Sequence, residues 1–250
     1  MIFSFTNQKG GVGKTTSALN TGVYLAEKGR KVLLIDIDPQ ANLTSGLGMK
    51  FHDEHNTVFD LLTKDIKASE IFYSTKIKNL YIMPSSIELA GAEIELVGMM
   101  SRETVLKKKL EQVSSSFDFV FIDCPPSLGL LTINALTASD SVIIPVQCEY
   151  FALEGLGQLV KTIKLVRKNL NPTLSIAGVI MTMFDSRTNL SKDVVNEVQN
   201  YFKSKVFDTI IPRNVRLSEA PSHGKPISVY DPTSNGAKAY RNLADEILKL

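Results

Sequence analysis

A glycine-rich segment flanked by two lysines lies near the start of the chain, between five strand-like residues and a helical pattern. It reads Lys9-Gly10-Gly11-Val12-Gly13-Lys14-Thr15-Thr16. Glycines allow positive φ angles, so backbone N–H groups can converge on phosphate oxygens, and the N-terminus of the following helix attracts anions. Lys14 is spaced to contact the β- and γ-phosphates of a nucleotide, and Thr15 to ligate Mg²⁺. The segment therefore predicts a P-loop, although Gln8 stands where the general pattern has a glycine.

Two further segments place carboxylates at the ends of apolar strand patterns. Residues 117–122 lead into Asp123, which is positioned to hold Mg²⁺ directly or through its waters. Residues 33–35 lead into Asp36 and Asp38, which share one face of an extended chain because strand side chains alternate. Asp38 lies at the mouth of the loop, where it can orient an attacking water. For Asp36, a bond to the magnesium shell and structural support of the P-loop both stay open.

The composition is that of an ordinary globular protein. With 250 residues, 44% hydrophobic and 22% charged, the chain is long enough for one large core. Its apolar runs, such as residues 32–35, are too short to span a bilayer, and a strand pattern starting at residue 2 argues against a cleavable signal peptide. Two cysteines, Cys124 and Cys148, indicate reduced thiols in such a chain. We therefore expect a cytoplasmic protein.

Strand and helix patterns alternate along the chain. The predicted strands are 2–6, 31–37, 80–83, 117–122, 141–146, 174–181 and a short one around 209–211. The predicted helices are 15–27, a short one after Thr57, 86–97, 103–113, 130–138, 153–169, 190–202 and 236–250. Such alternation implies right-handed crossovers. We therefore expect one doubly wound α/β domain over residues 1–250, with a mostly parallel sheet flanked by helices on both faces and ligands at the carboxyl ends of the strands.

Lys9 is the unusual residue of the loop. Its position matches the deviant Walker A signature K-G-G-x-G-K-[ST] of the ParA/MinD ATPases, and residues 36–40 resemble their Walker A′ segment, which ends in D-x-D-P-Q. Residues 123–129, 145–149 and 222–226 resemble the chromosomal ParA branch, often called Soj. The resemblance covers nearly the whole chain. It implies a P-loop NTPase fold of the deviant Walker A class. Unlike many plasmid-type relatives, this chain is expected to have no N-terminal helix-turn-helix extension, so the resemblance does not imply sequence-specific operator binding.

The resemblance also implies a weak, partner-stimulated, Mg²⁺-dependent ATPase that works as an ATP-sandwich dimer. In this family the residue matching Lys9 reaches the nucleotide of the partner subunit, much as an arginine finger does. The residue matching Asp38 has the hydrolytic role, so the implied catalytic set is Lys9, Lys14 and Asp38. The implied phosphate contacts are Lys9, Gly10, Gly11, Val12, Gly13, Lys14, Thr15 and Thr16. The implied metal site consists of Thr15, Asp123 and Asp36.

Recognition of the base is assigned to a segment near the C-terminus. Residues 211–221 resemble the ParA segment in which a proline packs on adenine and nearby polar groups contact its edge. Carried over by position, Pro212 and Asn214 become the base contacts. An ordinary turn with Pro and Asn is the alternative interpretation, and it stays open. Residues 183–185 follow another predicted strand and are a candidate for the opposite wall.

Basic residues concentrate in the C-terminal part of the chain. Residues 1–150 carry 14 basic and 17 acidic side chains, whereas residues 151–250 carry 14 basic and 9 acidic ones. This pattern leaves DNA binding and a merely solvated surface both open. The family resemblance implies that Arg187 and Arg216 bind double-stranded DNA without sequence preference in the ATP-bound dimer. It also implies a ParB-type centromere-binding partner and a nucleoid-associated location.

Other functions make different demands on the sequence. A MinD-like, membrane-cycling regulator of division-site placement needs a C-terminal amphipathic anchor. Residues 236–250 contain no Trp or Phe and few basic residues. We therefore expect them to form a core-packing helix, and we expect no membrane binding. A metabolic P-loop ligase needs a small-molecule pocket that the sequence does not identify. An iron–sulfur reductase needs cysteine spacing that this chain lacks. His52 and His55 are expected to be solvated loop residues.

Overall fold

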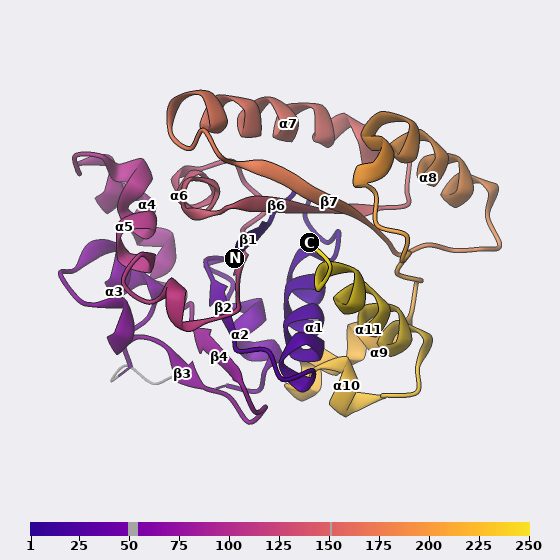
Figure 1. Cartoon of the computed structure of the whole chain (residues 1–250), viewed down its shortest axis with the longest axis horizontal. Coiled ribbons are helices and arrows are strands. Elements are labelled where there is room, and N and C mark those ends of the chain that lie inside the picture. The colour runs from indigo at the N-terminus through magenta and orange to yellow at the C-terminus, as the bar shows by residue number, and fades with distance from the viewer. Residues whose placement is uncertain (50–54, 151) are drawn as a thin grey trace.

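A seven-stranded sheet forms the centre of the structure (Figure 1). The computed structural model describes residues 1–49, 55–150 and 152–250, so the expectation for His52 lies outside the described residues. The strands are β1 (Ile2–Phe5), β2 (Val32–Asp36), β3 (Tyr73–Ser74), β4 (Leu80–Met83), β5 (Phe119–Asp123), β6 (Ser141–Gln147) and β7 (Ser175–Thr182). Their order is β3-β4-β2-β5-β1-β6-β7, and every neighbouring pair is parallel except β3 with β4. The predicted mostly parallel sheet is confirmed, whereas the short antiparallel β3 was not predicted.

Helices cover both faces of this sheet. They are α1 (Lys14–Glu27), α2 (Asn42–Gly46), α3 (Val58–Thr63), α4 (Leu89–Val97), α5 (Val105–Leu110), α6 (Leu130–Ala138), α7 (Ala152–Asn169), α8 (Asn189–Phe202), α9 (Val215–Glu219), α10 (Ile227–Tyr230) and α11 (Asn235–Ile247). In β2, Val32 and Leu34 pack in the cluster that contains α1 and α11, whereas Leu33 and Ile35 pack in the cluster of α3 to α6. Figure 1 shows α7 and α8 together at one end, where a third cluster joins them to β6 and β7. Burial on both faces explains why these strands are continuous apolar runs.

The strands that carry the predicted motifs are neighbours in the sheet. Phe5, the last residue of β1, pairs with Asp123 at the end of β5. Asp36, the last residue of β2, pairs with the same Asp123 from the other side. Because parallel strands end at a common edge, the loop after β1 and the carboxylate-bearing turns after β2 and β5 meet there.

The last helix, α11, packs into the core as predicted. Tyr240, Leu243 and Ile247 are buried against the face that α1 also covers, and the Tyr240 hydroxyl lies 3.1 Å from the Ser17 hydroxyl. Its apolar side is therefore occupied within the chain. Among the described residues no helix combines the length and the apolar character needed to cross a membrane.

The predicted short strand around 209–211 is wrong. The chain runs beside β7 but bonds to it only at separated points, through Phe207 N–H to Val179 O (3.0 Å) and Ile211 N–H to Met181 O (2.8 Å). Between these points, the N–H groups of residues 208 and 209 donate to the Glu246 carboxylate of α11, each at 2.8 Å. A carboxylate from a distant helix thus takes the donors that a strand ladder needs, so no regular strand forms.

Candidate nucleotide site

The predicted P-loop connects β1 to α1 and is held in a tight turn. Gly11 and Gly13 have φ angles of 71° and 87°, which favour glycine strongly, and α1 begins directly after Gly13. The Lys14 side chain is buried, and its ammonium donates to the Lys9 carbonyl oxygen at 3.1 Å. Burial lowers the pKa of Lys14, and the neighbouring Asp123 carboxylate opposes that shift. The loop is therefore shaped before any anion arrives.

Two buried side chains that sequence reasoning missed brace this loop. Thr182, the last residue of β7, donates its hydroxyl hydrogen to the Val12 carbonyl oxygen at 2.8 Å. Asn7 donates its side-chain amide to the Pro145 carbonyl oxygen at 2.7 Å and accepts the Lys9 N–H at 3.0 Å. Asn7 lies three residues before Gly10 in the sequence. Its closeness to the loop was the only sequence signal that it braces the loop. Thr182 lies 170 positions from its partner, and only the fold brings the two together.

Asp123 is a buried carboxylate that lacks a partner. It ends β5, is fully buried, and neither oxygen has a hydrogen-bonding partner of good geometry in the described part of the chain. Burial raises its pKa well above the usual range and Asp36 raises it further, whereas Thr15 and Lys14 lower it. An orphaned, buried oxygen ligand beside a P-loop threonine is the donor type that Mg²⁺ prefers, so a divalent cation fits this position.

The two carboxylates after β2 have different surroundings. Asp36 is fully buried and accepts hydrogen bonds from the Thr44 N–H (2.9 Å), the Thr44 hydroxyl (2.7 Å) and the Asp38 N–H (3.2 Å). Burial raises the pKa of Asp36 to about 6. These bonds attach the start of α2 to the end of β2. Asp38 lines the cleft described below, and its backbone carbonyl is held by the Ser85 hydroxyl at 2.7 Å.

A cleft of about 640 Å³ extends from the P-loop to the C-terminal segment. Its lining includes the loop residues Gly10, Gly11, Gly13, Lys14, Thr15 and Thr16 together with Asp38, Met183, Pro212 and Asn214. The two predicted base contacts therefore share one cavity with the phosphate loop. The Asn214 side chain also caps α9, because its oxygen accepts the Arg216 N–H at 2.9 Å. Of the predicted opposite wall, Met183 lines the cleft, whereas Asp185 is paired with Arg187.

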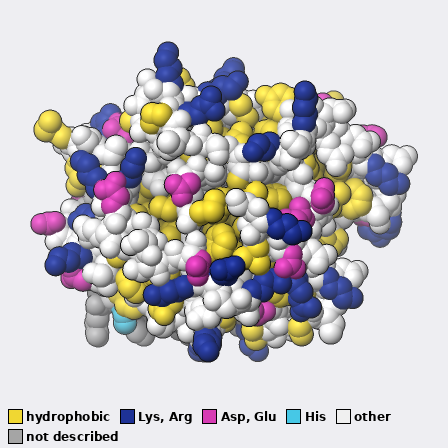
Figure 2. Space-filling view, viewed as in Figure 1, with side chains coloured by type: hydrophobic (Ala, Val, Ile, Leu, Met, Phe, Trp, Pro, Cys, Tyr) yellow, Lys and Arg dark blue, Asp and Glu magenta, His cyan; other side chains and the backbone are white. Residues whose placement is uncertain are grey.

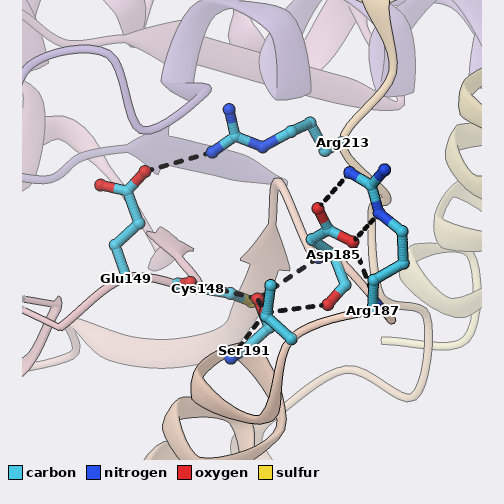
Figure 3. Close-up of polar contacts among 7 residues, drawn as sticks. Cys148, Glu149, Asp185, Arg187, Ser191 and Arg213 are labelled. Atoms are coloured by element: carbon cyan, nitrogen blue, oxygen red, sulfur yellow. Dashed lines mark hydrogen bonds and ion pairs between the residues drawn. The ribbon is translucent and has the colours of Figure 1, made fainter.

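Lys9 points across the mouth of the loop to a carboxylate of the β6–α7 turn. Its ammonium lies 3.6 Å from Glu149 Oε2, and the other oxygen of Glu149 accepts a hydrogen bond from Arg213 at 3.2 Å. Figure 3 shows the Arg213 side chain extended toward Glu149, near the neighbouring Asp185 and Arg187 pair. Sequence reasoning placed Lys9 but missed both of these partners.

The two predicted DNA contacts are exposed arginines with carboxylate partners. Arg187 follows β7 and makes two side-chain hydrogen bonds to Asp185, at 2.9 and 2.6 Å (Figure 3). Arg216 lies on α9, with Glu219 at 2.9 Å and Asp231 at 3.6 Å. In the view of Figure 2, Lys and Arg side chains stand over α7 at the upper edge, and elsewhere they are mixed with acidic ones. The basic surface on this face is therefore interrupted rather than continuous.

Comparisons with known proteins identify the family of this chain. A family model described as an AAA domain matches residues 1–176. The chain is 60% identical over 246 residues to the sporulation initiation inhibitor protein Soj of Bacillus subtilis, covering 98% of this chain and 97% of the relative. It is 55% identical over 244 residues to the chromosome-partitioning ATPase Soj of Treponema pallidum, covering 98% and 95%.

Solved structures share the fold over the same extent. One of them, described as cobyrinic acid a,c-diamide synthase from Mycobacterium smegmatis with bound ADP and magnesium, superimposes with a TM-score of 0.87 at 40% identity, covering 99% of this chain and 94% of that one. The relatives in sequence and the solved structures thus both confirm the predicted P-loop fold. On the relatives' identity across nearly the entire length, the chain belongs to the Soj/ParA family of chromosome-partitioning ATPases.

Proposed function

We propose that this protein is an ATP-driven DNA-partitioning switch. ATP and Mg²⁺ occupy the cleft, two subunits pair around the nucleotides, and the pair binds double-stranded DNA without sequence preference on the nucleoid. A ParB-type centromere-binding partner stimulates hydrolysis and so releases the DNA. The observation that supports this most is the buried Asp123, which has no hydrogen-bond partner among the described residues, beside a preformed P-loop. That loop lies at one end of a cleft whose other end holds Pro212 and Asn214.

The phosphate loop supplies binding and charge. We assign the phosphate contacts to the backbone of Gly10, Gly11, Val12, Gly13, Lys14, Thr15 and Thr16, with the Lys14 ammonium turning from the Lys9 carbonyl toward the β- and γ-phosphates. Pro212 and Asn214 contact the base from the far end of the cleft. Bound Mg²⁺ neutralises phosphate charge, and Thr15 and Asp123 hold it. Asp36 takes part through water, since its oxygens already accept hydrogen bonds from Thr44 and Asp38.

Hydrolysis requires a positioned water and a stabilised transition state. Asp38 lines the cleft next to the loop and is held by Ser85, so it is assigned to orient the attacking water. Lys9 lies at the exposed mouth of the loop, and its assigned role is to reach the triphosphate of the partner subunit. Because Lys9 acts on the other molecule, nucleotide occupancy would control whether the chain is single or paired.

Two other functions have weaker support. Membrane cycling of the MinD type needs a free amphipathic helix, but the apolar side of α11 is buried against the core. A biosynthetic ligase role is suggested by the description of the Mycobacterium smegmatis structure at 40% identity. The relatives at 60% and 55% identity are named for sporulation control and chromosome partitioning, so we favour partitioning by residues 1–250 acting as one unit.

A nucleotide-dependent gel shift tests the proposal. Asp38→Ala should bind ATP, hydrolyse it far more slowly, and accumulate as a DNA-bound dimer, while ADP and no nucleotide leave nonspecific DNA unshifted. Light scattering on the same samples reports pairing, and liposome sedimentation tests membrane binding. If ATP leaves Asp38→Ala monomeric and unable to retain DNA, partitioning by this mechanism is wrong. Sedimentation with liposomes would instead favour the membrane-cycling alternative.

A further inference from the structure

Glu149 is the common partner of two cations that belong to different parts of the site. One of its oxygens faces Lys9 at the mouth of the P-loop. The other accepts from Arg213 (Figure 3), which stands between Pro212 and Asn214 in the sequence. All three side chains are partly exposed, with 37% of Lys9, 43% of Glu149 and 56% of Arg213 accessible. The cluster therefore lies at the open rim of the cleft, where a second molecule could approach.

The backbone around this cluster is anchored, so the side chains alone are free to exchange partners. Cys148, next to Glu149, donates its N–H to the Thr182 carbonyl at 3.0 Å, and Thr182 also braces the P-loop. The Lys9 N–H is held by Asn7, a contact that remains when the Lys14 ammonium turns from the Lys9 carbonyl to the phosphates. Moving the Lys9 ammonium away from Glu149 thus requires a change of side-chain rotamer and no movement of the loop.

We propose that Glu149 is a positioning residue that holds Lys9 in its own subunit and gives it up only to the triphosphate of a partner. The inference rests on the proposed function, because it assumes that Lys9 acts in trans. A single carboxylate competes poorly with the clustered charges of a bound triphosphate, but it competes better when the γ-phosphate is absent. Glu149 therefore opposes pairing in general and sharpens the dependence of pairing on ATP over ADP.

Arg213 tunes this competition. It shares the carboxylate with Lys9, so it reduces the negative charge that Lys9 experiences. When the Lys9 ammonium moves to the partner's triphosphate, Arg213 stays paired with Glu149. The negative charge of the carboxylate therefore keeps a cationic partner. The two neighbours of Arg213 in the sequence, Pro212 and Asn214, line the cleft. Through Glu149 and Arg213, the position of the Lys9 side chain is therefore linked to the base-contact segment. Loss of Glu149 and loss of Arg213 should consequently change pairing in opposite directions.

The test measures pairing with hydrolysis blocked. In an Asp38→Ala background with Mg²⁺ and ATP, the dimer dissociation constant is determined by analytical ultracentrifugation. Partly exposed ion pairs change an equilibrium by factors of roughly 1.4 to 5.5. Because a dimer contains two copies, Glu149→Gln should tighten pairing by roughly 2- to 30-fold. Arg213→Gln should weaken it, and in the presence of Glu149→Gln it should have no further effect. The gain from Glu149→Gln should shrink as salt is raised.

A matched control removes the same charge elsewhere. Glu219→Gln also turns a partly exposed, arginine-paired glutamate into an amide, but it lies on α9 away from Lys9, and it should leave pairing unchanged.

Nucleotide affinity of the single chains, measured with a fluorescent ATP analogue, should be the same for Glu149→Gln and its parent. If the Asp38→Ala parent itself stays monomeric with ATP, the proposed function fails. If the parent pairs but Glu149→Gln pairs equally or more weakly, the role of Glu149 is overturned and the proposed function stands.

Discussion

The Thr182 hydroxyl at the end of β7 donates to the Val12 carbonyl oxygen in the middle of the P-loop, at 2.8 Å. Both residues are buried, and a Cβ built on Gly13 would lie 3.7 Å from the Thr182 methyl. The loop is thus supported from β7, which lies on the other side of β1 from β5 and β2, the strands that lead into the three aspartates. This contact predicts that a residue outside every phosphate motif controls nucleotide affinity.

Thr182→Val should weaken ATP binding without abolishing it. The substitution keeps the shape of the side chain, but it leaves the Val12 carbonyl without its donor, which costs about 1–3 kcal/mol. We expect ATP affinity to fall roughly 5- to 150-fold if the whole of that loss is expressed in nucleotide binding. Thr137→Val is the matched control, because that buried hydroxyl bonds within α6 to Ile133 O at 2.7 Å. Equal ATP affinities for the two variants in a calorimetric titration would refute the bracing role.

Asp123→Asn should stabilise the nucleotide-free protein against unfolding and abolish its ATP hydrolysis. A buried carboxylate without a partner destabilises the fold, and an isosteric amide removes the charge, so we expect the free energy of unfolding to rise by about 1–3 kcal/mol near pH 7. ATP hydrolysis should be lost because the metal loses a ligand. Denaturant unfolding with and without Mg²⁺-ATP reports both effects. A destabilised free variant would show that Asp123 has a stabilising partner.

Asp60 should make a pH-dependent contribution to stability through the start of α3. Burial acts against ionisation, but hydrogen bonds from Lys64 and from the Thr57 N–H, at 2.7 Å, outweigh it and lower the pKa of Asp60. A carboxyl whose folded pKa is depressed stabilises above its unfolded pKa, about 3.9, and loses that contribution as the pH falls through the folded value. Asp60→Ala should therefore cost about 1 kcal/mol at pH 7 and progressively less below pH 4. Urea titrations at pH 7 and pH 3 check this difference.

Arg216 should gain DNA affinity when its neighbouring acid is neutralised. Glu219 lies 2.9 Å from Arg216 and competes with phosphate for the guanidinium. In the ATP-bound, Asp38→Ala background, Glu219→Gln should tighten binding to nonspecific DNA severalfold, whereas Arg216→Ala should reduce binding and lower the salt slope by about 1. Pairing should be unaffected in both variants. Filter binding across a salt series separates these outcomes, and an unchanged salt slope for Arg216→Ala would remove that residue from the DNA interface.

Local sequence determined the sheet core and the phosphate motifs. Strands β1, β2 and β5 were predicted because each is an apolar run bounded by turn-forming residues, and parallel strands deliver the residues that follow them to one edge. The P-loop was predicted from its glycines, Lys14 and Thr15, and Asp123 from its place at the end of an apolar run. The segment 209–211 also looks extended, but its prediction as a strand failed because a helix nearly forty residues away takes its backbone donors.

Only the tertiary structure decided which side chains meet across the site. Val12 with Thr182, and Lys9 with Glu149 and Arg213, are contacts between segments that no periodicity relates. Sequence left Asp36 open between metal binding and support, and the fold shows its oxygens bonded to α2. The physical reason is the same in each case: strand and helix patterns are set by neighbours in the chain, whereas the partner of a polar side chain is set by packing of distant elements.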